Sequence, residues 1–205
     1  RKQKKGMAGI KDNIQKILNG FPSHVELVVA AKGRRVEDIL EAIDGGAKII
    51  GENYLQEAEE KFNAIGTKVK WHFIGHLQKN KVKKAVQIFD IIETVDSVEI
   101  AGVIDKACAG TNKIMPILIE VNSGREKNKS GALPEDVEIL ARHILELKNI
   151  KLTGLMTMGP LLKNPEDYRP YFKETKAIFD KIKSSADIKY LSMGMSDSYH
   201  IAIQE

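Results

Sequence analysis

Residues 27–53 read LVVAAKGRRVEDILEAIDGGAKIIGEN, which places two short apolar runs on either side of an amphipathic stretch. The β-branched run at Val25–Ala31 predicts a strand, and a second strand is expected at Lys48–Gly51. The stretch between them has the i, i+3, i+4, i+7 spacing of one buried helix face, formed by Val36, Ile39, Leu40 and Ile43. A strand, a helix and a second strand in this order build a parallel sheet with right-handed crossovers.

The same alternation continues to the last residue, after a leading helix with its apolar face at Ile10, Ile14, Ile17 and Leu18. Five further strands are expected, at Trp71–Gly75, Ile91–Val95, Ile117–Val121, Leu152–Thr157 and Tyr190–Met193. Seven strand–helix units leave two α/β architectures, a doubly wound open sheet and a (β/α)8 TIM-type barrel whose eighth strand is missing from this chain. A full barrel typically needs about 250 residues, and this chain has 205. We favour the barrel, because no dinucleotide-binding or P-loop glycine pattern follows the first strand.

Composition excludes several other classes of protein. Hydrophobic residues make up 42% and charged residues 29%, which is ordinary for a globular domain and too apolar for a disordered chain. No apolar run is long enough to span a membrane. A single cysteine, Cys108, allows no internal disulfide, and no apolar signal core follows the start RKQKKGMAG. We therefore expect a cytoplasmic protein.

The charge of the chain is concentrated at its start. Four of the 32 basic residues lie in the first five positions, and the remaining 28 balance the 28 acidic residues. A neutral body argues against a nucleic-acid surface. We expect residues 1–6 to be a disordered basic leader or a cloning remnant, and residues 7–205 to be one C-terminally incomplete barrel domain.

Lys32 is the most informative single residue, because it ends the run LVVAAK at the carboxyl end of the first strand. Functional residues gather at that end of the strands in both candidate folds. Val28, Ala30 and Lys32 occupy alternate positions and therefore share one face of the strand, so we expect the lysine to point inward among small and apolar neighbours. Desolvation there would favour the neutral amine, the form that forms a Schiff base with a carbonyl group. The alternative is a solvated lysine that begins a loop.

Other strand ends carry weaker signals. Asn53 can contact a ligand or act as the N-cap of the next helix. The loop Val121–Gly131 suits an anion, or is an ordinary solvent loop. The segment Ser192–Ser198 offers hydroxyls and amides to a phosphate, or holds only a helix N-cap at Ser196 or Asp197.

We interpret the remaining polar patterns as structural features and not as functional sites. His72 and His76 lie too far apart on a strand to share one ion, so no metal is expected. The cluster of Lys79, Lys81, Lys83 and Lys84 is read as a solvated helix face.

Five segments occur in the order typical of one family: GENY, HFIGHLQ, EVN with KSG, GLMTMG and SMGMS. With them, the chain resembles the pyridoxal phosphate homeostasis protein family, from about Ile10 to the last residue. The family is similar to the N-terminal barrel of alanine racemase. The resemblance implies that pyridoxal 5′-phosphate (PLP) is held as a Schiff base on Lys32. It also implies a role in the intracellular PLP pool, without an established catalytic activity. The chain departs from the family at Gly33 and Arg34, where a Thr-Lys pair is usual.

The resemblance also implies roles for other residues. Asn53, Met156, Ser192 and Gly194 become cofactor-binding candidates, although methionine more often packs in a core. Lys129 of KSG becomes a candidate relay or secondary PLP site. Partners are expected to be PLP and apo forms of PLP-dependent enzymes, and the assembly a monomer or weak homodimer.

Two enzyme functions are alternatives to a binding role, and the end of the chain carries one structural expectation. An amino-acid racemase is the alternative function, but it needs a second base, which alanine racemase takes from outside this barrel. A Schiff-base aldolase is disfavoured, because the lysine lies at the wrong strand. Family members continue with an eighth strand, so we expect a gap between the first and seventh strands and a half-built phosphate site at Ser192–Ser196.

Overall fold

The computed structural model describes residues 9–205, so the basic leader expected at residues 1–6 lies outside the described residues. The chain forms two compact units, Arg1–His72 and Phe73–Glu205. Seven strands form one sheet in the order β1-β2-β3-β4-β5-β6-β7.

The first unit contains the strand–helix–strand segment that opens the fold. Its elements are α1 (Ile10–Asn19), β1 (Val28–Ala30), α2 (Val36–Asp44), β2 (Ile49–Glu52), α3 (Leu55–Ile65), the 3-10 turn Gly66–Lys68, and β3 (Lys70–Phe73), whose last residue begins the second unit. Strand β1 pairs in parallel with β2, from Val28 opposite Ile49 to Ala30 opposite Gly51. Ile14 of α1 packs in a buried cluster with Ala42 and Ala47. The predicted face of α1 therefore contributes to this core, whereas α2 contributes Ala42, which is not one of its predicted face residues.

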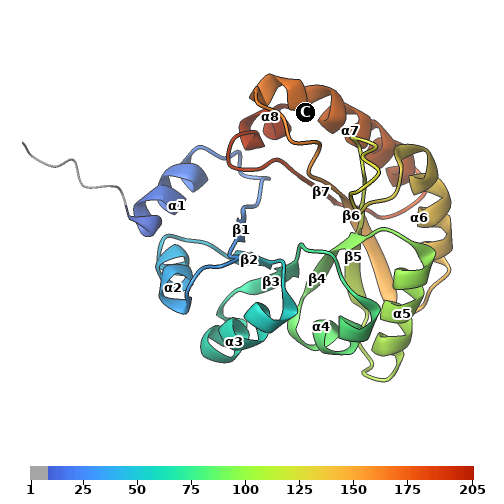
Figure 1. The fold of residues 1–205 in the computed structure, drawn as a ribbon, viewed down its shortest axis with the longest axis horizontal. Helices are drawn as coiled ribbons and strands as arrows, with labels where there is room; N and C mark the ends of the chain where they lie inside the picture. Colours follow the sequence, from blue (N-terminus) through green and yellow to red (C-terminus); the bar gives the residue numbers. More distant parts are fainter. Residues whose placement is uncertain (1–8) are drawn as a thin grey trace, which may run out of the picture. The chain divides into compact units, whose positions relative to one another are not determined.

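The second unit continues the alternation (Figure 1). Its elements are the 3-10 turn Lys79–Lys81, α4 (Val82–Ile88), β4 (Ile91–Val95), α5 (Val98–Ala109), β5 (Met115–Glu120), the 3-10 turn Pro134–Asp136, α6 (Val137–Leu145), β6 (Ile150–Thr157), the 3-10 turn Pro165–Tyr168, α7 (Arg169–Lys183), β7 (Tyr190–Met193) and α8 (Tyr199–Gln204). Strands β4 to β7 pair in parallel, each with the next along the chain. Helices α5, α6 and α7 lie together on one side of these strands.

The strand order decides between the two architectures. A doubly wound sheet reverses its strand order at a switch point, whereas these strands follow chain order from β1 at one end to β7 at the other. The fold is therefore that of a (β/α)8 barrel that lacks its eighth unit in the described part of the chain, and the doubly wound alternative is wrong. Strand β1 is shorter than expected, and the helix expected at Lys79 begins as a 3-10 turn before α4.

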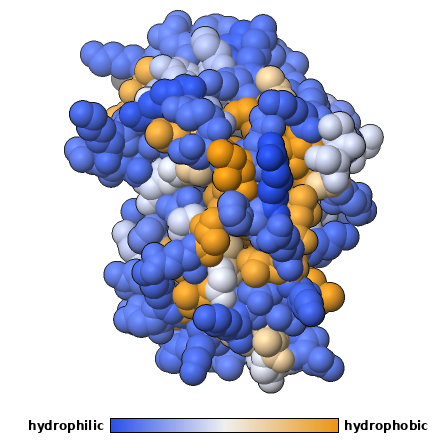
Figure 2. All heavy atoms as spheres, turned by 90° about the vertical axis from the view of Figure 1, so that its right-hand side faces the viewer, coloured by the Kyte–Doolittle hydropathy of each residue, from blue (hydrophilic) through white to orange (hydrophobic). Residues whose placement is uncertain are grey.

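The face viewed in Figure 2 is mostly hydrophilic, with apolar atoms gathered through its middle. Cys108 is fully buried, and burial raises the pKa of its thiol, so the sulfur packs as a core atom. No helix within residues 9–205 is both long and apolar enough to cross a membrane.

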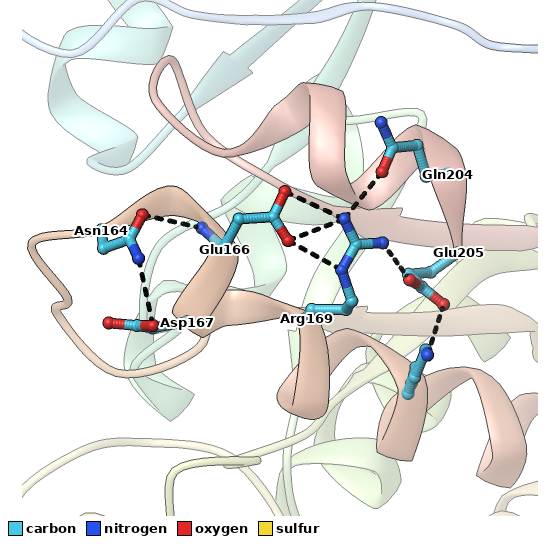
Figure 3. Close-up of polar contacts among 7 residues, drawn as sticks. Asn164, Glu166, Asp167, Arg169, Gln204 and Glu205 are labelled. Carbon is cyan, nitrogen blue, oxygen red and sulfur yellow. Dashed lines mark hydrogen bonds and ion pairs between the residues drawn. The ribbon is translucent and has the colours of Figure 1, made fainter.

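Arg169 at the start of α7 anchors the short helix α8. Its guanidinium donates to Glu166 at 2.9 and 3.0 Å, to Gln204 at 2.8 Å, and to Glu205. Figure 3 shows the guanidinium between Glu166 on one side and Gln204 and Glu205 on the other. Because an arginine fork fixes geometry as well as charge, this contact holds α8, and with it the end of the loop that begins at Gly194.

Candidate functional site

The candidate residues are distributed over both units, and each group is placed by its own unit. Lys32 and Asn53 follow strands of the first unit. The second unit carries Lys129, Met156, Ser192 and Gly194.

Lys32 is exposed to solvent, and its Nζ lies 5.3 Å from the centroid of the Tyr54 ring. The expected desolvation of this lysine is therefore wrong, while its inward direction stays a prediction. Strand β1 ends at Ala30, which is itself exposed, and the chain turns at once, with Arg34 N donating to Ala31 O at 3.0 Å. The terminal strand of the sheet has a neighbour on one side only, so little protein covers this side chain. The tyrosine ring gives the ammonium a cation–π contact in water.

The backbone beside Lys32 is tied to a buried cluster that the sequence did not reveal. Lys61 of α3 is 5% exposed, and its Nζ donates to Ala31 O at 2.8 Å. The same Nζ donates to Glu52 Oε1 at 2.6 Å and to Glu57 Oε2 at 3.0 Å. Burial raises the pKa of Glu52, whereas a hydrogen bond from Gly33 N–H lowers the pKa of Glu57. The i, i+4 spacing of Glu57 and Lys61 was the one available signal.

Asn53 is partly buried between β2 and α3. Helix α3 begins at Leu55 with Tyr54 as its N-cap, and no side chain provides a cap hydrogen bond. The alternative in which Asn53 caps this helix is therefore wrong, and a role toward a ligand stays a prediction.

Ser192 of β7 points into the second unit, toward a carboxylate. Its Oγ donates to Glu93 Oε2 at 2.7 Å, and Glu93 is buried. Met156 of β6 is buried and lies opposite Ser192 in the strand register. Because the Ser192 hydroxyl proton serves Glu93, a phosphate in this loop would need other donors.

Gly194 is placed by geometry that excludes a side chain. Its φ is +84°, and an added Cβ would lie 2.6 Å from Tyr199 Cα. Helix α8 has Ser198 as its N-cap, whose buried Oγ accepts from Met195 N at 3.1 Å. The alternative of an N-cap at Ser196 or Asp197 is therefore wrong, because the helix begins later, and both residues lie exposed before its N-cap.

The loop Val121–Gly131 is ordered by its own polar contacts. Asn122 Nδ2 donates to Glu126 O at 2.9 Å, and Glu126 N donates back to Asn122 Oδ1 at 3.1 Å. Lys129 is exposed and pairs with Glu126 Oε2 at 2.7 Å. Both interpretations of this loop, an anion site and an ordinary solvent loop, stay predictions, and Lys129 pairs with a partner on its own loop.

Two hydroxyls connect this loop to the end of β6. Thr157 Oγ1 donates to Val121 O at 2.9 Å, so Ser123 Oγ donates to Thr157 Oγ1, also at 2.9 Å. His76 Nδ1 lies 3.1 Å from Ser130 Oγ, which places the histidine at the same loop. Among residues 9–205 there is no group of three or more His, Cys, Asp or Glu side chains that could hold a metal ion.

Glu120 is a second residue that the sequence did not single out. It ends β5 opposite Met156, and burial together with the nearby charge of Asp96 raises its pKa to about 7. Asp96 in turn accepts a hydrogen bond from Gly131 N at 3.3 Å. The carboxyl ends of β4 and β5 thus carry two interacting acids, one of which is half protonated near neutral pH.

Comparison with known proteins gives one consistent family. Residues 7–204 match the model of the alanine racemase N-terminal domain. The pyridoxal phosphate homeostasis protein of Aquifex aeolicus is 40% identical over 183 residues, which cover 88% of this chain and 80% of that protein.

Solved structures agree with the sequence relatives. PipY of Synechococcus elongatus, solved without PLP, superposes with a TM-score of 0.90 at 28% identity over 96% of this chain and 94% of that chain. Its structure with PLP bound gives a TM-score of 0.88 at 26% identity, over 96% and 93% of the two chains. Alanine racemase of Clostridium difficile, at 15% identity and a TM-score of 0.74 over 90% of this chain and 50% of its own, shares the fold alone.

Proposed function

Because this chain belongs to the pyridoxal phosphate homeostasis protein family, we propose that it binds PLP as a Schiff base on Lys32 and takes part in intracellular PLP homeostasis. The observation that supports this most directly is the accessible amine of Lys32 at the carboxyl end of β1. The relative PipY, with PLP bound, supports the same cofactor.

The residues of this chain fit that cofactor in their chemistry. PLP supplies an aldehyde that a lysine amine can capture and a phosphate that needs several donors together. Lys32 is exposed, so its amine is accessible to the aldehyde. The loop after Ser192 presents the exposed Ser196 hydroxyl and a glycine without a side chain at Gly194.

The other cofactor contacts in the proposal follow the family resemblance. They are Asn53 in the first unit and Met156, Ser192 and Gly194 in the second, with Lys129 as the relay or secondary PLP site. Apo PLP-dependent enzymes are the proposed recipients, the cytoplasm the proposed location, and a monomer or weak homodimer the proposed assembly.

We propose a binding role rather than catalysis. The relatives are named homeostasis proteins, and the likeness to alanine racemase reaches the fold alone. A racemase needs a base on each face of the substrate carbon. A racemase-like enzyme remains the alternative, and chiral analysis of single L-amino acids incubated with the PLP-loaded protein separates the two. Sustained turnover of any amino acid would overturn the binding role.

The assignment of Lys32 is tested by reductive trapping. Wild-type protein, Lys32→Ala and the control Lys16→Ala, which changes an exposed lysine of α1, are incubated with PLP and reduced with borohydride. Peptide mass spectrometry should find the reduced cofactor on Lys32 in wild type and control. Lys32→Ala should fold normally and show no stable adduct, because the side chain contributes a nucleophile and no core volume. Stoichiometric trapping in Lys32→Ala would show that the lysine is assigned wrongly.

A further inference from the structure

The buried ammonium of Lys61 is unusual in the partners that it has. Lysine is almost never fully buried unless it is paired, and here three oxygens surround one Nζ. Two are carboxylate oxygens, of Glu52 and Glu57, at 2.6 and 3.0 Å, and the third is the main-chain oxygen of Ala31 at 2.8 Å. The third contact matters most, because it attaches the charge cluster to a loop rather than to a helix or strand interior.

The cluster holds the backbone on both sides of Lys32. Ala31 precedes the lysine, and its carbonyl accepts from Lys61. Gly33 follows the lysine, and its N–H donates to Glu57 Oε2 at 2.8 Å. Lys61 and Glu57 are themselves one helical turn apart on α3 and contact each other. The residues on either side of Lys32 are thus fixed to the same rigid helix.

Stability alone does not account for this arrangement. A buried ion pair often contributes no more than a well-packed apolar substitute would. Here the balance is poorer still, because two carboxylates face one ammonium and Glu52 Oε2 is buried without a hydrogen-bond partner among the described residues. Such a group costs free energy that packing of α3 does not require. What the arrangement gains is position, since Lys61 and Glu57 together hold a carbonyl and an N–H two residues apart.

We propose that Lys61 and Glu57 are positioning residues that fix the main chain on both sides of Lys32 and thereby set where its amine can meet a carbonyl group. The inference rests on the proposed function, because it concerns the efficiency of capture by Lys32. Neither residue touches the cofactor in this role. They act through the backbone of Ala31 and Gly33, while the Lys32 side chain itself stays free to exchange its ligand.

The test removes the oxygen that holds Gly33. Glu57→Ala deletes it, Glu57→Gln keeps a neutral acceptor at the same place, and Glu60→Ala is the matched control on the exposed side of α3. The readout is the rate constant for PLP capture at Lys32, measured by borohydride quench at matched folded protein, beside the thermal midpoint. We expect capture by Glu57→Ala to slow about tenfold, since small misplacements of a reacting group cost this much or more. Glu60→Ala should match wild type, and Glu57→Gln should recover most of the rate.

The outcomes separate this inference from the function on which it rests. If wild type fails to capture PLP, the proposed function falls, whatever the variants do. If wild type captures PLP and Glu57→Ala does so at the rate of Glu60→Ala, the positioning role is overturned and the function stands. If Glu57→Ala does not fold, the test relies on Glu57→Gln alone, with hydrogen–deuterium exchange of the Gly33 amide measured beside the rate of PLP capture. If the Gly33 amide of Glu57→Gln exchanges as slowly as in wild type and PLP is captured at the wild-type rate, the positioning role is supported. If the Gly33 amide exchanges without protection and PLP is still captured at the wild-type rate, the positioning role is overturned.

Discussion

Replacing Glu120 with glutamine should stabilise the protein in a pH-dependent way. Glu120 ends β5 partly buried, and burial together with the charge of Asp96 raises its pKa to about 7. Glutamine has nearly the same shape and carries no charge at any pH. The substitution therefore removes the cost of an ionised carboxylate at this place and leaves the packing unchanged.

The sign and size follow from linkage. In the unfolded chain the Glu120 carboxyl titrates near its ordinary value of 4.5. Between that value and about 7 the folded state binds more protons than the unfolded state, so the free energy of unfolding of wild type falls as pH rises. The contribution of the neutral Glu120 carboxyl to the free energy of unfolding is fully present below pH 4.5 and is lost above about pH 7. Each pKa unit is worth about 1.4 kcal/mol, which sets an upper limit of about 3.5 kcal/mol for this shift. Solvent access reduces our expectation to about 2 kcal/mol.

The assay is urea unfolding of wild type and Glu120→Gln at pH 4.5 and pH 8.5. We expect equal stability at the lower pH and a variant more stable by about 2 kcal/mol at the higher pH. Glu146→Gln, at an exposed carboxylate of the same unit, serves as the control and should change stability equally at both values. Asp96→Asn should reduce the effect, because it removes the second cause of the raised pKa.

A pH-independent difference between wild type and Glu120→Gln would refute the reasoning. It would show that the carboxyl is ionised in the fold without penalty. A variant that is less stable at pH 8.5 would show instead that the carboxylate has a favourable partner there.

Two further substitutions test the second unit. Gly194→Ala should lower the free energy of unfolding by about 1–3 kcal/mol in urea, because φ is +84° and the new Cβ would press on Tyr199. Gly102→Ala, inside α5 with open space around it, should instead stabilise by up to about 1 kcal/mol, and equal effects of the two would contradict the steric argument. Lys129→Ala breaks an exposed ion pair with Glu126 and should change stability by less than about 1 kcal/mol, yet slow PLP transfer to an acceptor apo-enzyme. An unchanged transfer time course at matched PLP occupancy would remove it from the mechanism.

The order of elements was predictable because its signals are local. Apolar spacing in one short segment selects helix or strand whatever the rest of the chain does. Strand β7 was predicted with its observed bounds, Tyr190–Met193. The regular alternation left two architectures, the missing glycine pattern after the first strand favoured the barrel, and the sequential strand order confirms the barrel.

The environment of the key side chains was not predictable in the same way. Parity along the first strand suggested a desolvated Lys32, but parity says which face a residue takes and not what covers that face. Only the tertiary structure shows that β1 ends early and that Lys32 stands in solvent. Likewise, Ser192 finds Glu93 across 99 residues of chain, a contact that no sequence window contains.

The sequence by itself determined the fold class, the family and the strand ends at which function should be sought, since each of these rests on periodicity or on contiguous motifs. Only the tertiary structure decided which charges meet. Lys61 reads in the sequence as an ordinary helical lysine, yet it lies buried against the carbonyl of Ala31, 30 residues away. Burial and charge pairing depend on three-dimensional neighbours, because the free energy of an ion is set by the water and the partners around it.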